Sequence, residues 1–345
     1  MTQPEFPIPV CVLGATGSVG QRFISLLDGH PWFDLVAVAA SSRSAGKTYG
    51  EAVRWSLPEP MPKRVASMVV RSADDIPRVE GRIAFSALDS DVAGPIEKAF
   101  AADGRFVVTN AKNHRMDPRV PLIVPEANAD HLTLLESQDF GEGRILANPN
   151  CSTIGLVLAL KPLADSFGFK RASVTTMQAL SGAGLGGPTA FGMTDNLIPF
   201  ISGEEEKLEN ETKKILDDAH CIVSAQCNRV GVVDGHTLCI SVELENEASA
   251  PELIQTWREF RGEPQELQLP SAPKHPTIYI DAPDAPQPRL HRELEGGMAT
   301  ALGRLRECSV LDWKFVALSH NTLRGAAGGA ILAAELAVAK EFLPG

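Results

Sequence analysis

The sequence predicts an α/β protein of two domains, with a doubly wound parallel sheet at the N-terminus and an α+β domain after it. Three observations lead to this prediction. Strand-like and helix-like segments alternate over residues 1–150, the later segments are long strands with alternating β-branched residues, and 345 residues exceed what one small core uses.

The alternating elements of the first half are recognised by short apolar runs and by helical spacing of apolar residues. We expect strands at 9–13, 35–40, 82–88 and 106–109, and helices at 19–27 and 92–100. Alternation of this kind is typical of a parallel sheet that helices cover on both faces.

The second half predicts a mixed sheet with helices on one face and the other face free to pack against another subunit. Its expected strands are 172–180, 236–245, 298–306 and 313–319, and its expected helices are 204–216 and 250–260. A final helix at 331–340 would return to the first domain. We therefore predict a cofactor domain of residues 1–150, completed by 321–345, and a catalytic and oligomerisation domain of residues 151–320.

The charge balance and the N-terminus exclude several classes of function. A formal net charge of −11 repels nucleic-acid backbones, so nucleic acid is not an expected partner. An anionic substrate would need a local basic pocket. The N-terminus lacks a basic region followed by an apolar segment, and no apolar run is long enough to span a bilayer. We expect a cytoplasmic protein that does not enter a membrane.

The six cysteines show neither a C-x-x-C pair nor metal-ligand spacing, so no metal site is predicted. In a reducing compartment most should be buried thiols that behave as small hydrophobes. Cys11 and Cys239, inside expected strands, are assigned to that class. Cys151 differs because it stands in a polar turn that opens a helix.

A glycine-rich turn follows the first expected strand and opens the first helix. Gly14, Gly17 and Gly20 permit a tight turn and the close approach of a pyrophosphate to the helix N-terminus, as in Rossmann-type dinucleotide sites. The predicted contacts are Gly14, Thr16, Gly17, Ser18 and Val19.

The end of the second strand favours NADP(H) over NAD(H). An NAD site usually carries an acidic residue there for the ribose 2′-hydroxyl. This strand instead runs into Ser41, Ser42 and Arg43, with Lys47 nearby. Hydroxyls and a guanidinium suit a 2′-phosphate, which a carboxylate would repel.

Cys151 follows Asn-Pro-Asn and precedes an apolar run with helical spacing. The helix dipole would lower the pKa of its thiol, and the free N–H groups there could hold an oxyanion. The alternative is a buried structural thiol in the domain interface. A thiolate beside a nicotinamide suggests that an acyl group passes through a thioester, which NADPH reduces.

Eight segments together resemble the aspartate-semialdehyde dehydrogenases, in the branch of fungal and archaeal enzymes. They are GATGSVGQRF (14–23), SSRSAGKTY (41–49), TNAKNHRM (109–116), NPNCST (148–153), MQALSGAG (177–184), DNLIPFISGEEEKLENETKKIL (195–216), SAQCNRVGVVDGHT (224–237) and SHNTLRGAAGG (319–329). The resemblance covers essentially the whole chain and implies a fold like that of glyceraldehyde-3-phosphate dehydrogenase.

The resemblance also implies roles for single residues. Cys151 would be the nucleophile with Asn150 beside it, His236 the acid/base that takes and returns the thiol proton, and Gln178 the residue that positions the substrate. Arg229 would pair with the substrate carboxylate. The remaining implied contacts are Glu204 and Lys207 for the ammonium and the phosphate, Arg115 with Asn113 and Lys112 for the phosphate, and Gly182, Gly184, Asn321 and Ser86 for the cofactor.

The implied activity is reductive dephosphorylation of L-4-aspartyl phosphate to L-aspartate 4-semialdehyde, toward lysine, threonine, methionine and isoleucine. The resemblance further implies a homodimer or homotetramer. Three alternatives stay open at this point: a malonyl-CoA reductase, an N-acetyl-glutamyl-phosphate reductase, and a non-catalytic NADPH-binding regulator.

Overall fold

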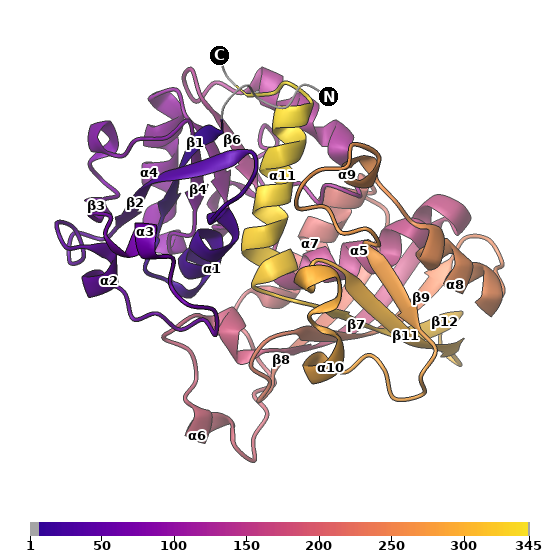
Figure 1. The fold of residues 1–345 in the computed structure, drawn as a ribbon. Helices are drawn as coiled ribbons and strands as arrows, with labels where there is room; N and C mark the ends of the chain where they lie inside the picture. The colour runs from indigo at the N-terminus through magenta and orange to yellow at the C-terminus, as the bar shows by residue number, and fades with distance from the viewer. Residues whose placement is uncertain (1–6, 344–345) are drawn as a thin grey trace.

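The computed structural model describes residues 7–343. Residues 1–6, part of the N-terminus in which no signal peptide is expected, and residues 344–345, the end of the predicted cofactor domain, lie outside the described residues. Two six-stranded sheets organise the chain, one in each half, and α11 runs between them (Figure 1). No helix of residues 7–343 is long and apolar enough to cross a membrane.

The first sheet is parallel throughout and has the strand order β3-β2-β1-β4-β5-β6. Its strands are β1 (Ile8–Leu13), β2 (Phe33–Ala40), β3 (Arg71–Ser72), β4 (Ile83–Ser86), β5 (Phe106–Thr109) and β6 (Arg144–Ala147). The helices of this half are α1 (Ser18–Leu27), α2 (Tyr49–Ala52), α3 (Lys63–Ala66) and α4 (Ser90–Ala102), with 3₁₀ turns η1 (Ile76–Arg78), η2 (Lys112–His114) and η3 (Ala129–Ser137). The prediction of a parallel, helix-covered sheet is confirmed.

The second sheet is mixed, with the order β10-β11-β12-β9-β7-β8. Its strands are β7 (Phe169–Gln178), β8 (Ile222–Arg229), β9 (His236–Leu244), β10 (Thr277–Ile280), β11 (Thr300–Glu307) and β12 (Trp313–Ser319). The expected antiparallel pairing of the last two strands is confirmed. Two strands of this sheet were not predicted: β8, which pairs parallel with β7, and the short strand β10.

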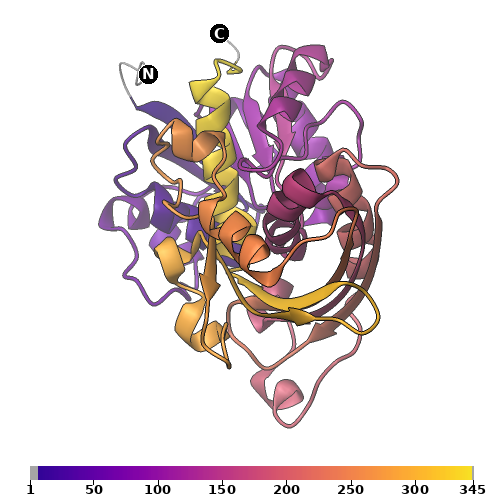
Figure 2. The same cartoon turned by 90° about the vertical axis from the view of Figure 1, so that its right-hand side faces the viewer.

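Helices pack on one face of the second sheet, which curves around them in Figure 2. They are α5 (Cys151–Phe167), α7 (Glu204–Leu216) and α8 (Ala250–Glu259). The short elements of this half are η4 (Leu180–Ala183), α6 (Ala190–Met193), α9 (Glu263–Glu266), α10 (Pro288–His291) and η5 (Leu294–Gly297). The α5 helix is apolar on nearly all sides because it lies between the two sheets, with residues in the cores on both sides.

The outer face of the second sheet is open. In β8, Ile222, Ser224 and Gln226 are exposed while Val223 and Ala225 between them are buried. Cys239 in β9 lies on the open face and is exposed, so its assignment to the buried thiols was wrong. Periodicity placed it in a strand but could not tell which face of that strand would be covered.

The chain returns to the first half through the π-helical turn η6 (Leu323–Ala327) and α11 (Gly328–Ala339). The apolar residues of α11 are buried in the core that β1 and β2 also line. The turn η6 is held by a fully buried ion pair between Arg324 and Glu126. The return therefore packs η6 against the start of α5, where Cys151 lies.

Candidate active site

A cavity of about 650 Å³ lies between the two halves of the chain and reaches from the glycine turn to Cys151. Its lining comes from loops of both halves, from the starts of α1 and α5, from η6 and from α7. The lining residues are Gly17, Ser18, Val19, Ala87, Leu88, Asp89, Ser90, Asn110, Ala111, Lys112, Arg115, Asn150, Cys151, Ser181, Gly182, Ala183, Gly184, Leu185, Gly186, Glu204, Lys207, Asn321, Thr322, Gly325 and Ala326.

The glycine turn has the geometry that a bound pyrophosphate requires. Gly14 has φ +73°, and a Cβ on it would come within 2.4 Å of the Ala87 carbonyl oxygen, so glycine is needed there. Gly17 is the N-cap of α1, so no capping side chain binds the first N–H groups of this helix. Ser18 and Val19 in the first turn of α1 line the cavity. The first N–H groups of α1 can therefore receive an anion.

The other residues predicted to contact the cofactor fall into two groups. Gly182, Gly184 and Asn321 line the cavity, whereas Ser41, Ser42 and Arg43 lie exposed just beyond β2 and do not. Ser86 is fully buried and donates to Glu97 at 2.6 Å, so its hydroxyl faces away from the cavity. Thr16 does not line the cavity either.

Cys151 is the first residue of α5, as the sequence predicted. The side-chain oxygen of Asn150 accepts from the N–H groups of Ser152 and Thr153, which is an N-cap that fixes the start of the helix. Sγ of Cys151 lies 3.2 Å from Nε2 of His236, the first residue of β9. The two residues are 85 positions apart in the chain and meet because β9 and α5 pack together.

The pKa of Cys151 differs from the sequence-based expectation. Burial and the nearby charge of Glu204 raise the pKa of the thiol to about 12, although Arg115 and Arg229 act in the opposite direction. The helix dipole alone would have lowered it, and burial outweighs that effect. Burial and the charge of Arg229 lower the pKa of His236 to about 3. The pair therefore rests as a neutral thiol beside a neutral imidazole.

The backbone of Ala179 determines where the imidazole proton lies. Its N–H donates to Nδ1 of His236 at 3.0 Å, so Nδ1 is an acceptor and the neutral ring carries its proton on Nε2, toward the sulfur. The carbonyl of the same residue accepts from Arg229 at 2.6 Å. A role for His236 as acceptor of the thiol proton would need the opposite tautomer.

Glu204 and Lys207, three residues apart on α7, form an ion pair, with Nζ of Lys207 2.6 Å from Oε1 of Glu204. Glu204 also accepts from the side-chain amides of Asn150 and Gln178. Burial disfavours ionised Glu204, but Lys207 and these hydrogen bonds lower its pKa below the ordinary value. Glu204 is thus a buried carboxylate beside the nucleophile.

Arg115 and Lys112 line the cavity, whereas Asn113 turns away and donates to the Ser90 carbonyl. Arg229 and Gln178 are buried and do not line the cavity. A Cβ on Gly182 would lie 2.9 Å from Nη1 of Arg229. Of the guanidinium nitrogens of Arg229, only Nη1 has a hydrogen-bond partner among the described residues, so Nε and Nη2 can still receive a carboxylate.

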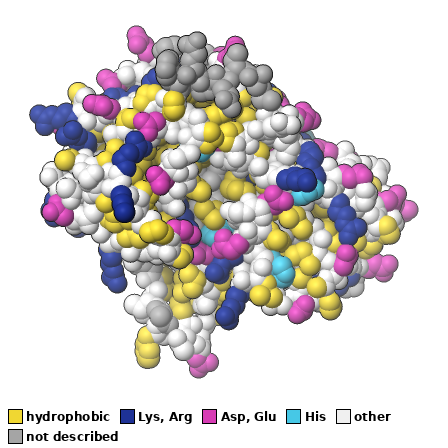
Figure 3. All heavy atoms as spheres, in the orientation of Figure 1, with side chains coloured by type: hydrophobic (Ala, Val, Ile, Leu, Met, Phe, Trp, Pro, Cys, Tyr) yellow, Lys and Arg dark blue, Asp and Glu magenta, His cyan; other side chains and the backbone are white. Residues whose placement is uncertain are grey.

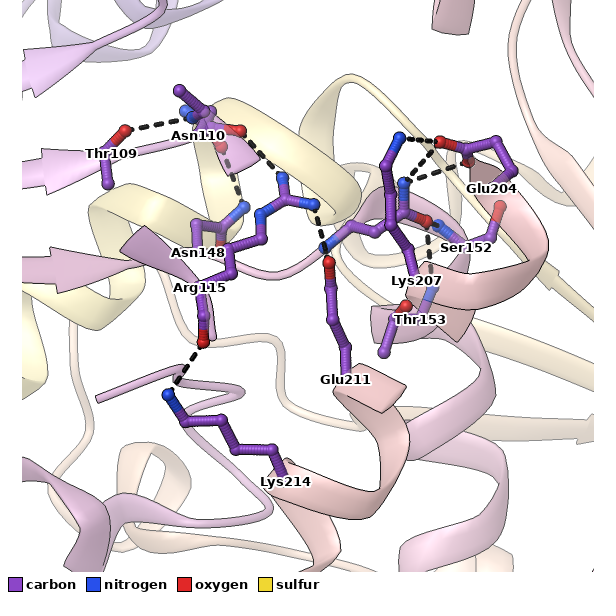
Figure 4. Close-up of polar contacts among 12 residues, drawn as sticks. Thr109, Asn110, Arg115, Asn148, Ser152, Thr153, Glu204, Lys207, Glu211 and Lys214 are labelled. Carbon is purple, nitrogen blue, oxygen red and sulfur yellow. Dashed lines mark hydrogen bonds and ion pairs between the residues drawn. The ribbon is translucent and has the colours of Figure 1, made fainter. Parts of the chain in front are cut away.

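Several residues of this site were not predicted from the sequence. Glu211 and Lys214 extend the polar face of α7 beyond Lys207 (Figure 4). The spacing of Glu204, Lys207, Glu211 and Lys214 along one helix face was a usable signal, because residues three and four apart are neighbours. Gly325 of η6, whose Cβ would lie 2.6 Å from that of Cys151, gave no such signal. Within residues 7–343, no group of three or more His, Cys, Asp or Glu side chains is arranged to bind a metal ion.

Comparison with known proteins identifies relatives over nearly the full length. Residues 9–135 match a family model described as semialdehyde dehydrogenase, NAD binding domain, and residues 160–324 match one described as semialdehyde dehydrogenase, dimerisation domain. The chain is 46% identical to an aspartate-semialdehyde dehydrogenase of Schizosaccharomyces pombe, covering 97% of this chain and 99% of the relative. It is 48% identical to that of Methanothermobacter thermautotrophicus, covering 95% and 98%.

Two solved structures agree with these matches. The aspartate-semialdehyde dehydrogenase of Candida albicans, solved with NADP, has a TM-score of 0.88 and 44% identity, covering 97% of this chain and 99% of that one. An enzyme from Vibrio cholerae, aspartate semialdehyde dehydrogenase II complexed with ASA, has a TM-score of 0.80 and 26% identity, with the same coverage.

Proposed function

The chain belongs to the aspartate-semialdehyde dehydrogenase family, and from that premise we propose that it converts L-4-aspartyl phosphate to L-aspartate 4-semialdehyde through a thioester on Cys151. Its place is in the biosynthesis of the aspartate-family amino acids. The observation that carries the mechanism is the 3.2 Å contact between Cys151 and His236 at the end of a cavity that begins at the glycine turn.

In the reductive direction the ionised sulfur of Cys151 attacks the acyl carbon and forms a C–S bond. The bond between that carbon and the phosphate oxygen breaks, and phosphate leaves with the electron pair. NADPH, when bound, supplies the hydride that reduces the thioester. Breaking the C–S bond then releases the aldehyde and returns the thiolate, so the sulfur needs no net proton over the cycle.

We assign His236 the role of hydrogen-bond donor in this cycle. Its Nε2–H points at Sγ because Ala179 occupies Nδ1. A donor in that position stabilises the thiolate when it forms and again when it leaves the tetrahedral intermediate. The thiol proton passes to water, and ionisation becomes easier when the substrate ammonium offsets the charge of Glu204, which otherwise raises the pKa of Cys151.

The substrate groups divide between two sides of Cys151. Arg229 would bind the α-carboxylate through its free donors, while Glu204 would bind the ammonium and Gln178 would help place the chain. Arg115 and Lys207 would hold the phosphate, and Lys112 and Asn113 would lie near it. Nε of Arg115 is buried without a partner among the described residues, although the residue lines the cavity, which suits an anion at this point.

NADP(H) is the proposed cofactor, as in the Candida albicans relative. Gly14, Gly17, Ser18 and Val19 would receive the pyrophosphate at the start of α1, with Thr16 in the same turn. Ser41, Ser42 and Arg43 would contact the 2′-phosphate. The nicotinamide would lie near Gly182, Gly184 and Asn321. Ser86, buried at the end of β4, would support the cofactor site.

We also propose that the working protein is a homodimer or homotetramer in the cytoplasm, assembled through the half that matches the dimerisation model. The open face of the second sheet, with exposed Ile222, is the surface we assign to subunit contact. Residues 1–150 with 321–345 would form the cofactor domain and residues 151–320 the catalytic domain. Six free cysteines suit a reducing compartment.

The test is an assay of phosphate-dependent NADP reduction with aspartate semialdehyde, run beside malonate semialdehyde with coenzyme A and N-acetyl-glutamate semialdehyde with phosphate. We expect turnover only with the first. Preferred turnover of either rival substrate, or NADPH binding without any turnover, would replace the proposed function by the corresponding alternative.

A further inference from the structure

Glu211 is a buried carboxylate of α7 whose two oxygens bind two different parts of the site. Oε1 accepts from Nη1 of Arg115 at 3.0 Å, and Oε2 accepts from the backbone N–H of Asn150 at 2.6 Å. The residue is 2% exposed. Figure 4 shows it below Arg115, on the same helix as Glu204 and Lys207. It therefore joins the basic end of the cavity to the residue that precedes the nucleophile.

The pairing requires a carboxylate. Both partners of Glu211 can only donate, since one is a guanidinium and the other a backbone N–H. Glutamine has the same shape but offers one acceptor and one donor, so it must turn an NH₂ group toward one of the two donors. Loss of either bond leaves a buried donor unsatisfied.

Arg115 is anchored at both terminal nitrogens. Nη1 binds Glu211, and Nη2 donates to the Asn110 carbonyl at 2.7 Å. The Nζ of Lys214 donates to the Arg115 carbonyl at 2.7 Å and to the Asp117 and Val120 carbonyls nearby, so the backbone of this loop is also fixed. With both ends held, the position of the guanidinium, whose Nε has no partner among the described residues, is set by Glu211 and Asn110.

Asn150 is held from α7 at two points. Its side-chain amide donates to Glu204 and its backbone N–H donates to Glu211, while its side-chain oxygen caps α5. Its backbone carbonyl accepts from the N–H of Ile154, so every polar group of Asn150 is bonded and the first turn of α5 is held against α7.

We infer that Glu211 is a positioning residue that sets the distance between the phosphate-binding arginine and the sulfur of Cys151. The inference rests on the proposed function, because it assumes that the leaving phosphate binds Arg115. A single carboxylate that joins Arg115 to the backbone beside Cys151 keeps the two groups at a fixed separation, and the transfer step needs that separation because phosphate leaves the carbon that the sulfur attacks.

Glu211→Gln tests the inference in the phosphate-dependent oxidation of aspartate semialdehyde. We expect kcat to fall and the KM for phosphate to rise by about tenfold to a hundredfold, while the KM values for the semialdehyde and NADP stay within about twofold. Glu211→Asp, which keeps two acceptor oxygens, should recover part of the loss. Glu206→Gln on the exposed side of the same helix is the matched control and should behave as the wild type.

A double-mutant cycle separates positioning from general damage. If Glu211 acts through Arg115, Glu211→Gln should add little to the phosphate KM in an Arg115→Ala background. Equal losses for all three substrates, or a full additional loss in that background, would overturn the inference. Wild-type protein without phosphate-dependent turnover would instead refute the proposed function, so the two failures are distinguishable.

Discussion

The backbone N–H of Ala179 donates to Nδ1 of His236 over 3.0 Å, and this bond fixes the face that the imidazole presents to Cys151. Ala179 lies between the end of β7 and the turn that covers Arg229. The carbonyl of Ala179 accepts from Nη1 of Arg229. One residue without a reactive side chain therefore orients two of the groups assigned to the chemistry.

The first prediction concerns the tautomer of His236. Since Nδ1 accepts from Ala179, the unliganded protein should hold a neutral ring with its proton on Nε2 at neutral pH, because burial and Arg229 lower the pKa of the ring to about 3. Long-range proton–nitrogen NMR on histidine-labelled protein would measure this, with His236→Asn to assign the signals. A neutral ring with its proton on Nδ1 would remove the donor role. A ring protonated on both nitrogens between pH 6 and 8 would still donate from Nε2, but it would contradict the lowered pKa, since this range lies near an ordinary histidine value of about 6.5.

The second prediction concerns the pH dependence of thiol reactivity. Burial and the charge of Glu204 raise the pKa of Cys151 to about 12, so its alkylation rate by iodoacetamide should climb about tenfold per pH unit through the neutral and alkaline range. Glu204→Gln removes a negative charge, lowers that pKa and should speed alkylation at any fixed pH below it.

The control for this experiment is Glu206→Gln, which removes an exposed charge from the same helix. Its alkylation profile should overlay the wild type. Slower alkylation of Glu204→Gln at fixed pH would mean that Glu204 supports the thiolate instead of opposing it.

The third prediction concerns Gly325 in η6. A Cβ there would lie 2.6 Å from Cβ of Cys151 and 3.0 Å from its Cα, so Gly325→Ala must push the nucleophile or the turn aside. We expect a loss of stability of about 1–3 kcal/mol and a larger proportional loss of kcat. Gly231→Ala is a suitable comparison, because its Cβ would meet only the Met193 carbonyl at 3.5 Å.

Thermal unfolding and steady-state kinetics of both variants check this prediction. A Gly325→Ala enzyme with wild-type kcat and stability would contradict it. That result would mean that η6 can move away from Cys151 without loss of stability or activity.

The fourth prediction concerns the choice of cofactor. Arg43 is exposed directly after β2, and β2 pairs with β1, whose end leads into the glycine turn. Arg43→Ala should raise the KM for NADP by about tenfold through loss of a charge-assisted contact to the 2′-phosphate, and leave the KM for NAD nearly unchanged. An equal rise of the KM values for NADP and NAD would show that Arg43 does not bind the 2′-phosphate.

The sequence predicted those parts of the fold that follow from local periodicity. The helix at 204–216 and the strand at 106–109 have the same bounds in the structure, because their apolar spacing and their flanking residues agree. The strand β8 was missed although its buried and exposed residues alternate, because the buried Ala225 and Cys227 are small and give a weak apolar signal. Its pairing with β7 identifies it in the structure. Such pairing is not encoded within the segment itself.

The site divides in a similar way. The position of Cys151 at a helix start could be inferred from Asn150 and the apolar run after it, since capping is a local signal. Its raised pKa could not, because burial by η6 and the charge of Glu204 depend on segments far away in the chain. The role of the Ala179 backbone could not be predicted either, since every residue except proline has a backbone N–H and the residue type does not show what it binds.

The central claim is that the sulfur of Cys151 becomes acylated during turnover. Incubation of the enzyme with aspartate semialdehyde and NADP, without phosphate, followed by acid quench and peptide mass mapping, tests it most directly. We predict an aspartyl adduct on the peptide that contains Cys151, which disappears when phosphate is added and is absent from Cys151→Ala. An adduct on another residue, or steady turnover by Cys151→Ala, would contradict the account.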